Sequence, residues 1–352
     1  MFSISSLRHF AACGFAIAMT GCATFHNAEP PPTIAKPIGI TYSEDGLSGM
    51  TDLPLGVFRV PDSEVLITGH QTPSVGGVMF GVVGLLASDA IDAAAGDKKT
   101  RDVQAALHLK VSTMAKEITQ QQIVAAGLGE VFRVDDNTAK HNLRIVSAMV
   151  LTYVSDTEVV PYVVLKPTLQ DAQKTALWGT RYLAAVGAPR PMSGDNGWAA
   201  DGGKPLRDAA SASLQRVVKV MLQDIVQPYP RDEKSLIVVE TGYPFARMRM
   251  QGFGFKLWED DETVGFVPKL GDAGVYTGVN ILDKRTSTSA PAPADANMML
   301  NVMPAKTQWP GQTPIASPKP FMSQPSQPDT SVPASTRTST DSTTVSATAA
   351  KP

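Results

Sequence analysis

Cysteine, histidine and charged residues are all scarce in this sequence. The 352 residues include two cysteines and five histidines, and only 18% of the residues are charged. Two cysteines cannot build a disulfide scaffold or a cysteine-based zinc site. The net charge of −2 leaves no basic excess to neutralise phosphates, so nothing suggests nucleic-acid binding, and no nucleic-acid partner is expected.

Sequence motifs of common enzymes are also missing. The chain has no G-x-S-x-G, H-E-x-x-H or C-x-x-C motif. The stretch Gly197–Lys204 departs from a phosphate-binding loop, because its spacing is off by one and Pro205 stands where Ser or Thr would hold magnesium. His70, His108 and His141 have no cysteine or carboxylate cluster beside them. We therefore expect no enzyme activity, no metal and no cofactor other than covalent lipid.

The N-terminal residues carry the clearest signal. Residues 1–22 read MFSISSLRHFAACGFAIAMTGC. Arg8 precedes an apolar run, Phe10–Met19, which is too short to cross a bilayer and has the length of a signal-peptide core. The run leads into Met19-Thr20-Gly21-Cys22, which resembles the lipobox of bacterial lipoproteins. An ordinary secretory signal with an incidental cysteine is the alternative.

The lipobox resemblance implies a modified Cys22. In that family the signal peptide, here residues 1–21, is removed, the cysteine thiol is joined to diacylglycerol and the new amino group is acylated. The next residue is Ala23 rather than Asp, and its resemblance to the enterobacterial sorting pattern implies the outer membrane, with the protein facing the periplasm. Several buried acyl chains anchor a protein stably. Cys13 would leave with the signal, so the mature chain would have no free thiol.

Composition divides the rest of the chain into four parts. Residues 22–54 are rich in Pro, Gly and Ser and are predicted to form a tether. Residues 55–230 predict an α+β periplasmic domain, and residues 236–284 a small antiparallel β unit, either a compact barrel or an extension of the first sheet. Residues 285–352, rich in Ser, Thr, Pro and Ala, predict a disordered tail. Removing the tail after Lys284 is expected to change stability by about a few tenths of a kcal/mol.

Hydrophobic periodicity predicts the elements of the α+β domain. Apolar residues three and four apart predict two amphipathic helices, Val103–Ala125, stopped at Gly127, and Leu206–Ile225. The strand-like runs between them are Leu143–Val154, Glu158–Leu165 and Thr175–Val186. Ser155-Asp156 predicts a tight hairpin turn. The fold class expected is α+β, an antiparallel sheet with both helices on one face.

Two further patterns concern shorter strands. The apolar residues near Pro61-Asp62 predict a strand pair or one broken strand. In the small β unit, a change of phase at Gln251-Gly252 predicts a β-bulge. The acidic run Glu259–Glu262 predicts a solvated hairpin tip rather than a cation site.

Residues 75–95 are unusually apolar and rich in glycine. Fourteen residues pass before the first charge, Asp89, and Gly77, Gly81 and Gly84 are spaced so that a backbone could approach closely. One interpretation is a buried helix that packs on the sheet. The other is a contact with the membrane or with a partner copy. Trp198, in the turn-rich stretch Gly187–Lys204, either packs on the body or contacts a partner.

The body resembles periplasmic α/β lipoproteins of envelope-assembly and secretion systems only loosely. The similarity consists of the Gly-rich stretch before Asp89-Ala90-Ile91-Asp92 and the amphipathic helix after it. It implies a non-enzymatic interaction or assembly module with an envelope protein partner not identified by sequence. The alternatives are a pore- or secretion-associated lipoprotein, with residues 75–95 used for self-association into a homo-oligomer or for membrane contact, and an envelope hydrolase with an unfamiliar site.

The lipobox interpretation gives a first testable prediction. Cys22→Ser is expected to abolish labelling by a fatty-acid probe and to leave unprocessed or mislocalised precursor, because Cys22 is the acylation candidate. Labelling and membrane partition are measured together on the same cells. Normal membrane partition of the variant would contradict the lipoprotein interpretation.

Overall fold

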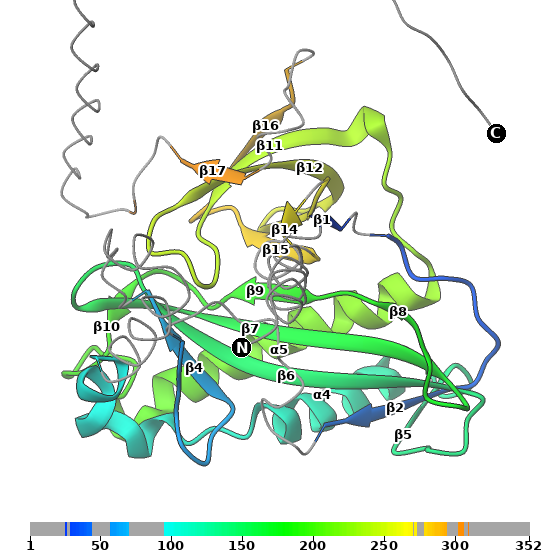
Figure 1. Cartoon of the computed structure of the whole chain (residues 1–352), viewed down its shortest axis with the longest axis horizontal. Coiled ribbons are helices and arrows are strands. Elements are labelled where there is room, and N and C mark those ends of the chain that lie inside the picture. Colours follow the sequence, from blue (N-terminus) through cyan, green and yellow to red (C-terminus); the bar gives the residue numbers. More distant parts are fainter. Residues whose placement is uncertain are drawn as a thin grey trace, which may run out of the picture. The chain divides into compact units, whose positions relative to one another are not determined.

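Two long antiparallel strands form the centre of the fold (Figure 1). β6 (His141–Tyr153) pairs along its whole length with β7 (Glu158–Asp171). The turn between them is closed by Ser155, whose hydroxyl oxygen accepts a hydrogen bond from the Glu158 N–H at 2.9 Å. The predicted hairpin and its turn are therefore confirmed. The structure, a computed structural model, describes residues 25–26, 29–43, 57–69, 95–269, 271–272, 278–293, 302–305 and 309.

Both faces of this hairpin are apolar, because most residues in the half next to the turn are hydrophobic. Odd-numbered residues such as Ile145, Met149 and Leu165 belong to the largest buried cluster of the described residues. Even-numbered residues such as Val150 and Tyr162 belong to a separate cluster on the opposite face. A strand with two buried faces reads as a continuous apolar run, which explains why the sequence shows little alternation here.

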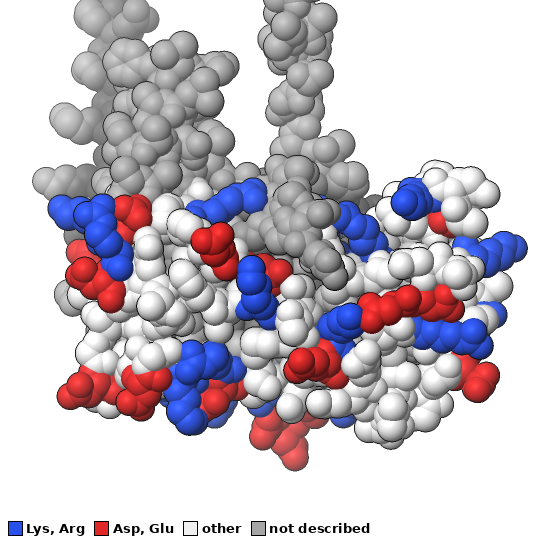
Figure 2. Space-filling view, turned by 90° about the horizontal axis from the view of Figure 1, so that it is seen from below, with Lys and Arg blue, Asp and Glu red and all other residues white. Residues whose placement is uncertain are grey.

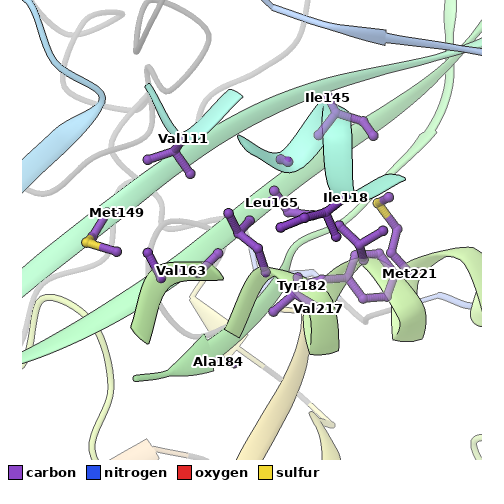
Figure 3. Packing of buried hydrophobic residues seen from close by; sticks show 14 of the residues in the cluster. Val111, Ile118, Ile145, Met149, Val163, Leu165, Tyr182, Ala184, Val217 and Met221 are labelled. Atoms are coloured by element: carbon purple, nitrogen blue, oxygen red, sulfur yellow. The ribbon is translucent and has the colours of Figure 1, made fainter. Parts of the chain in front are cut away.

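Helices cover the odd-numbered face. α4 (Val111–Ala125) and α5 (Ala200–Val226) pack against each other and against the hairpin. Figure 3 shows Ile118 of α4 and Val217 and Met221 of α5 directed toward β6, β7 and β9. The apolar stripe predicted for the second helix is buried along its whole length, which confirms that helix face: Leu206, Ala210, Leu214, Val217, Met221 and Ile225.

The first predicted helix is broken in two. A 3-10 helix, η2, spans Arg101–Leu107 and is followed by His108, and α4 begins at Val111. Glu64 provides the reason for a separate start, because its carboxylate accepts hydrogen bonds from the Ser112 N–H and the Ser112 hydroxyl, each at 2.6 Å. A carboxylate at this position satisfies a free N–H and opposes the positive end of the helix dipole. Gly127 (φ 65°) follows the end of α4, as predicted.

The chain is a mixed α and β protein whose body is mostly sheet, and the sheet is not purely antiparallel. On the free edge of β6 lie two parallel partners, β2 (Ile38–Tyr42) and β4 (Val65–Thr68). β4 also pairs with β3 (Phe58–Arg59), which confirms the predicted strand pair, and β2 with β5 (Phe132–Val134). The antiparallel prediction is wrong at these pairs. α4 lies in the chain between β2 or β4 and β6, and a connection through a helix brings strands together in parallel.

The second half of the sheet continues from β7. The edge of β7 opposite β6 pairs with β8 (Ala176–Gly179), β9 (Tyr182–Ala185) and β10 (Arg190–Pro191). β9 then pairs in parallel with β15 (Val279–Asp283), again across a helical connection, α5. Next come β13 (Thr263–Pro268), β12 (Met250–Glu259), β11 (Leu236–Thr241) and β16 (Thr288–Pro291). Three further short elements are η3 (Glu233–Ser235) and the paired strands β1 (Phe25–His26) and β14 (Gly271–Asp272).

This arrangement bears on two predictions for residues 236–284. The strands extend the first sheet through the β9–β15 pair, which was one of the two alternatives. The bulge predicted at Gln251-Gly252 is misplaced, because those residues pair regularly with β11, and the register shift lies between Lys256 and Trp258.

The folded part of the chain extends beyond residues 55 and 284, the limits predicted from the sequence. The tether prediction for residues 22–54 is wrong at β2, where Ile38 and Ile40 are buried between α4 and the sheet. The tail prediction for residues 285–352 is wrong at β16, which pairs with β11, at β17 (Val302–Pro304), which pairs with β12, and at the buried Trp309. Residues 310–352 lie outside the described part of the chain.

Truncation tests the corrected limit of the folded part. A chain ending at Lys284 loses β16, β17 and Trp309, and we expect a loss of about 3 kcal/mol or more, the usual effect of deleting one buried Trp side chain. A chain ending at Gln312 is the control, because it removes only the separate unit Thr313–Pro352. Urea unfolding of the two truncated chains and the full chain measures the difference. Equal stability of all three would contradict the correction.

Candidate functional site

The structure places some of the sequence-predicted site residues and not others. Cys22, Gly77, Gly81 and Gly84 lie outside the described residues. Trp198 is 2% exposed, and its indole Nε1–H donates a 2.8 Å hydrogen bond to the Val159 carbonyl oxygen. Of the two alternatives for Trp198, the structure shows the side chain packed on the body. A partner contact at Trp198 stays a prediction.

The histidines do not come together in the part of the chain that the structure describes. His108 follows η2, His141 begins β6, and His70 is outside the described ranges. Within those ranges no group of three or more His, Cys, Asp or Glu side chains could hold a metal ion.

A long groove beside α5 is the candidate site. Two hollows of about 570 and 500 Å³ lie along this helix and share Arg216 as a lining residue. The lining positions on α5 repeat every three or four residues: Pro205, Asp208, Ala209, Ala212, Ser213, Arg216, Lys219, Val220 and Gln223. At a rise of about 1.5 Å per residue, the stripe from Pro205 to Gln223 extends over roughly 27 Å. We call this feature the α5 groove.

The start of α5 shapes one end of the α5 groove. Asp201, Gly202 and Gly203 have positive φ angles, so the regular helix starts after them, and Pro205 stands in its first turn, where a missing N–H costs nothing. A Cβ at Gly203 would lie 2.4 Å from the Ala106 carbonyl oxygen. Glycine there lets the helix start close to η2.

The opposite wall comes from parts of the chain far away in sequence. It consists of the β12–β13 turn, the end of β15 and the Ala185–Arg190 loop. Asp260 closes the β12–β13 turn by accepting hydrogen bonds from the N–H groups of Glu262 (2.9 Å) and Thr263 (2.6 Å), and the Thr263 N–H holds the pKa of Asp260 below its ordinary value. The predicted hairpin tip is confirmed.

Aromatic side chains stand at one end of the α5 groove. The rings of Tyr229 and Trp258 have centroids 4.7 Å apart, inclined at 33°. Burial raises the pKa of Tyr229 to about 12, so its hydroxyl is neutral at physiological pH. At the other end, the Arg190 guanidinium lies 4.9 Å from the centre of the Trp198 ring.

A buried carboxylate, Asp224, holds Tyr229 in this position. Asp224 accepts hydrogen bonds from the Tyr182 hydroxyl (2.8 Å) and the Tyr229 N–H (2.8 Å), and it forms an ion pair with Arg231 at 3.4 Å. Arg231 in turn donates to the Tyr229 carbonyl oxygen at 2.6 Å. The network joins the end of α5 to β9 and fixes the following turn, which places Tyr229 against Trp258.

Charges of both signs face one another across the α5 groove. Arg216 and Lys219 lie on the helix side, and Asp261 and Glu262 on the hairpin side. The Arg216–Glu262 pair is 3.4 Å long with side chains 42% and 77% exposed, so water screens it strongly. Such a pair can exchange partners with an incoming polar molecule at little cost. On the face seen in Figure 2, basic and acidic side chains are likewise interspersed rather than gathered by sign.

The lining of the α5 groove consists mainly of charged, amide and aromatic side chains. Among the described residues that line it, none is a histidine or cysteine. Its lysine, arginine and carboxylate groups suit recognition of polar or charged groups, and its aromatic ends suit apolar ones.

Sequence reasoning identified Trp198 but missed the α5 groove. Arg216, Lys219 and Gln223 belong to the polar side of the predicted helix, and a polar helix side is normally interpreted as a solvent-exposed surface. The opposite wall depends on long-range pairing that local periodicity does not encode. The sequence did contain one indication of the site. Tyr229 and Trp258 are aromatic residues next to proline or acidic residues, a context in which an aromatic side chain is often exposed.

No family model matches the chain, and no curated protein matches it. Within the described residues, every helix is too short or too polar to traverse a bilayer.

The Asp224 network can be tested by substitution. Asp224→Ala removes the carboxylate that pairs with the buried Arg231 guanidinium and accepts the Tyr182 hydroxyl, so we expect a loss of about 3–5 kcal/mol in unfolding free energy. Asp208→Ala is the control on the same helix, because Asp208 pairs with Lys204 in solvent, and its loss should be below about 1 kcal/mol. Urea unfolding measures both. Similar losses would show that Asp224 does not anchor the end of α5.

Proposed function

We propose that this chain is a non-enzymatic lipoprotein of the bacterial cell envelope that binds a protein partner through the α5 groove. The observation that carries the anchoring is the sequence Met19-Thr20-Gly21-Cys22. In this proposal Cys22 is acylated and held in the outer membrane, and the body lies in the periplasm. The observation that supports binding is the α5 groove, a long hollow with exposed opposite charges and an aromatic pair.

The dimensions of the α5 groove favour a polypeptide segment as its ligand. An extended chain rises about 3.3 Å per residue, so roughly 27 Å accommodates about eight residues. Alternating acidic and basic side chains on such a segment would find partners on opposite walls, at Arg216 and Lys219 and at Asp261 and Glu262. The aromatic pair Tyr229 and Trp258 would receive an apolar side chain at one end.

A second candidate function is a pore- or secretion-associated lipoprotein. The fourteen uncharged residues before Asp89, with Gly77 and Gly81 four apart, favour it, because small residues at that spacing permit close contact between copies or with lipid. This second function requires residues 75–95 to face outward. Binding of a partner in the α5 groove has no such requirement.

Charge reversal tests the α5 groove in cells. The double variant Arg216→Glu with Lys219→Glu places like charges opposite Asp261 and Glu262 and opposite the acidic groups of a bound segment. We expect at least a ~10-fold loss of a specific photo-crosslink formed from position Gln223, since like charges at an interface cost more than about 1.4 kcal/mol.

The matched control is Arg133→Glu with Lys140→Glu, which changes the net charge equally at exposed positions away from the α5 groove. It should leave the crosslink unchanged. Equal loss in both double variants, or in neither, would contradict the proposed binding site.

A further inference from the structure

One arginine of the α5 groove is held by an aromatic ring instead of a carboxylate. Arg190, in β10, lines the hollow of about 500 Å³ near the start of α5. The central carbon of its guanidinium lies 4.9 Å from the centre of the Trp198 ring. A guanidinium that stacks on a ring keeps its N–H donors available for other groups, because those donors lie in its own plane.

The Trp198 ring is a fixed platform for this arginine. Its indole N–H donates to the Val159 carbonyl oxygen at 2.8 Å, and its backbone N–H donates to the Pro191 carbonyl oxygen at 3.0 Å. Arg190 is itself paired with Val159 in the β7–β10 ladder. The ring and the arginine are therefore attached to the same point of β7. Since Trp198 is 2% exposed and Arg190 is exposed, the ring can influence a partner through Arg190.

The other basic groups of this hollow already have carboxylate partners. They are paired one to one: Lys204 with Asp208, Arg216 with Glu262 and Arg285 with Asp283. Arg190 forms no ion pair with any described residue, although Asp201 lines the same hollow. Among the described residues, its guanidinium is thus positioned at the α5 groove without an anionic partner.

We propose that Arg190, stacked on Trp198, binds a carboxylate of the polypeptide segment that occupies the α5 groove. The carboxylate is either an Asp or Glu side chain or the C-terminal group of the segment. A planar guanidinium matches a carboxylate with two parallel hydrogen bonds, which an ammonium group cannot do. The inference rests on the proposed function. It makes Trp198 a positioning residue, which packs on the body and acts on the partner through Arg190.

The different ends of the α5 groove also assign a direction to the bound segment. Arg190 lines the hollow that includes Lys204 and Pro205, at the start of α5. Tyr229 and Trp258 lie at the other end. A segment that fits both ends carries its carboxylate at one end and an apolar side chain at the other, with most of its length between them.

A peptide microarray tests this assignment with the full chain, purified in a mild detergent. Random peptides of about eight residues, the length that the α5 groove accommodates, are attached through their N-termini and end in a free carboxylate or an amide. The labelled proteins are the parent chain, Arg190→Glu, Arg190→Lys, and the double variant Arg216→Glu with Lys219→Glu. Arg133→Glu is the control, at an exposed position away from the α5 groove. Thermal unfolding verifies that each variant is folded like the parent.

We expect the peptides bound by the parent chain to share a carboxylate near one end. Arg190→Glu should bind these peptides at least ~10-fold more weakly and should select peptides with Lys or Arg at the same place, because like charges repel. Arg190→Lys should keep the preference for a carboxylate but bind more weakly. Arg133→Glu should bind as the parent does. Comparison of the free and amidated peptides distinguishes a C-terminal carboxylate from a side chain.

Three results would overturn the inference. Peptides that depend on Arg216 and Lys219 but bind Arg190→Glu as well as they bind the parent would overturn it and leave the proposed binding site intact. Bound peptides with no carboxylate in common would have the same meaning. A parent chain that binds no peptide better than the double variant would contradict both the inference and the proposed function.

Two variants test the positioning role of Trp198 separately from folding. Trp198→Phe keeps an aromatic face under Arg190, whereas Trp198→Leu does not. Both are compared below their melting temperatures. We expect the Phe variant to retain the preference for peptides with a carboxylate and the Leu variant to lose it, while peptides without a carboxylate bind both variants equally. An equal preference in the two variants would contradict the positioning role.

Discussion

The β6–β7 ladder is the constraint on which the other elements depend. A two-stranded hairpin is marginal in water, and this one is apolar on both faces in the half next to its turn. It is stable only when both faces and both edges are occupied. α4 and α5 occupy one face, β2 and β4 share the free edge of β6, and β8, β9 and β10 share that of β7.

Two buried carboxylates fix how the helices attach to this ladder. Glu64 joins the β3–β4 turn to the start of α4, and its own carbonyl oxygen accepts a hydrogen bond from the Met149 N–H of β6 at 2.9 Å. Asp224 joins the end of α5 to β9 through Tyr182. Apolar packing alone allows helices to slide or rotate by small amounts, whereas a buried carboxylate with two or three donors allows a single arrangement. The position of α5, and with it the shape of the α5 groove, depends on Asp224.

Local features of the fold were predictable from the sequence, and long-range ones were not. The buried stripe from Leu206 to Ile225 and the turn at Ser155 are determined by neighbouring residues, so periodicity and turn chemistry found them. The parallel pairs of β2, β4 and β15 depend on which strands meet after a helix, and no local pattern encodes that.

Two strands were missed for local reasons. β2 was missed because Ile38–Tyr42 is a short run among Pro, Gly and Ser, and β16 was missed because a strand at the edge of a sheet can be exposed and polar. The α5 groove combines the polar side of a predicted helix with a distant hairpin tip, so apart from the aromatic residues Tyr229 and Trp258 nothing in its sequence indicated a site.

The parallel pairing of β9 with β15 also determines the order in which the sheet can form. The β6–β7 and β12–β13 hairpins join strands that are adjacent in sequence, so each closes a short loop. β9 and β15 are about 100 residues apart, and the chain entropy lost in bringing them together is correspondingly larger. We therefore expect the hairpins to form before the β9–β15 contact that joins the two halves of the sheet. On that expectation, both halves would present unpaired strand edges until the contact forms, which is when incorrect association is favoured.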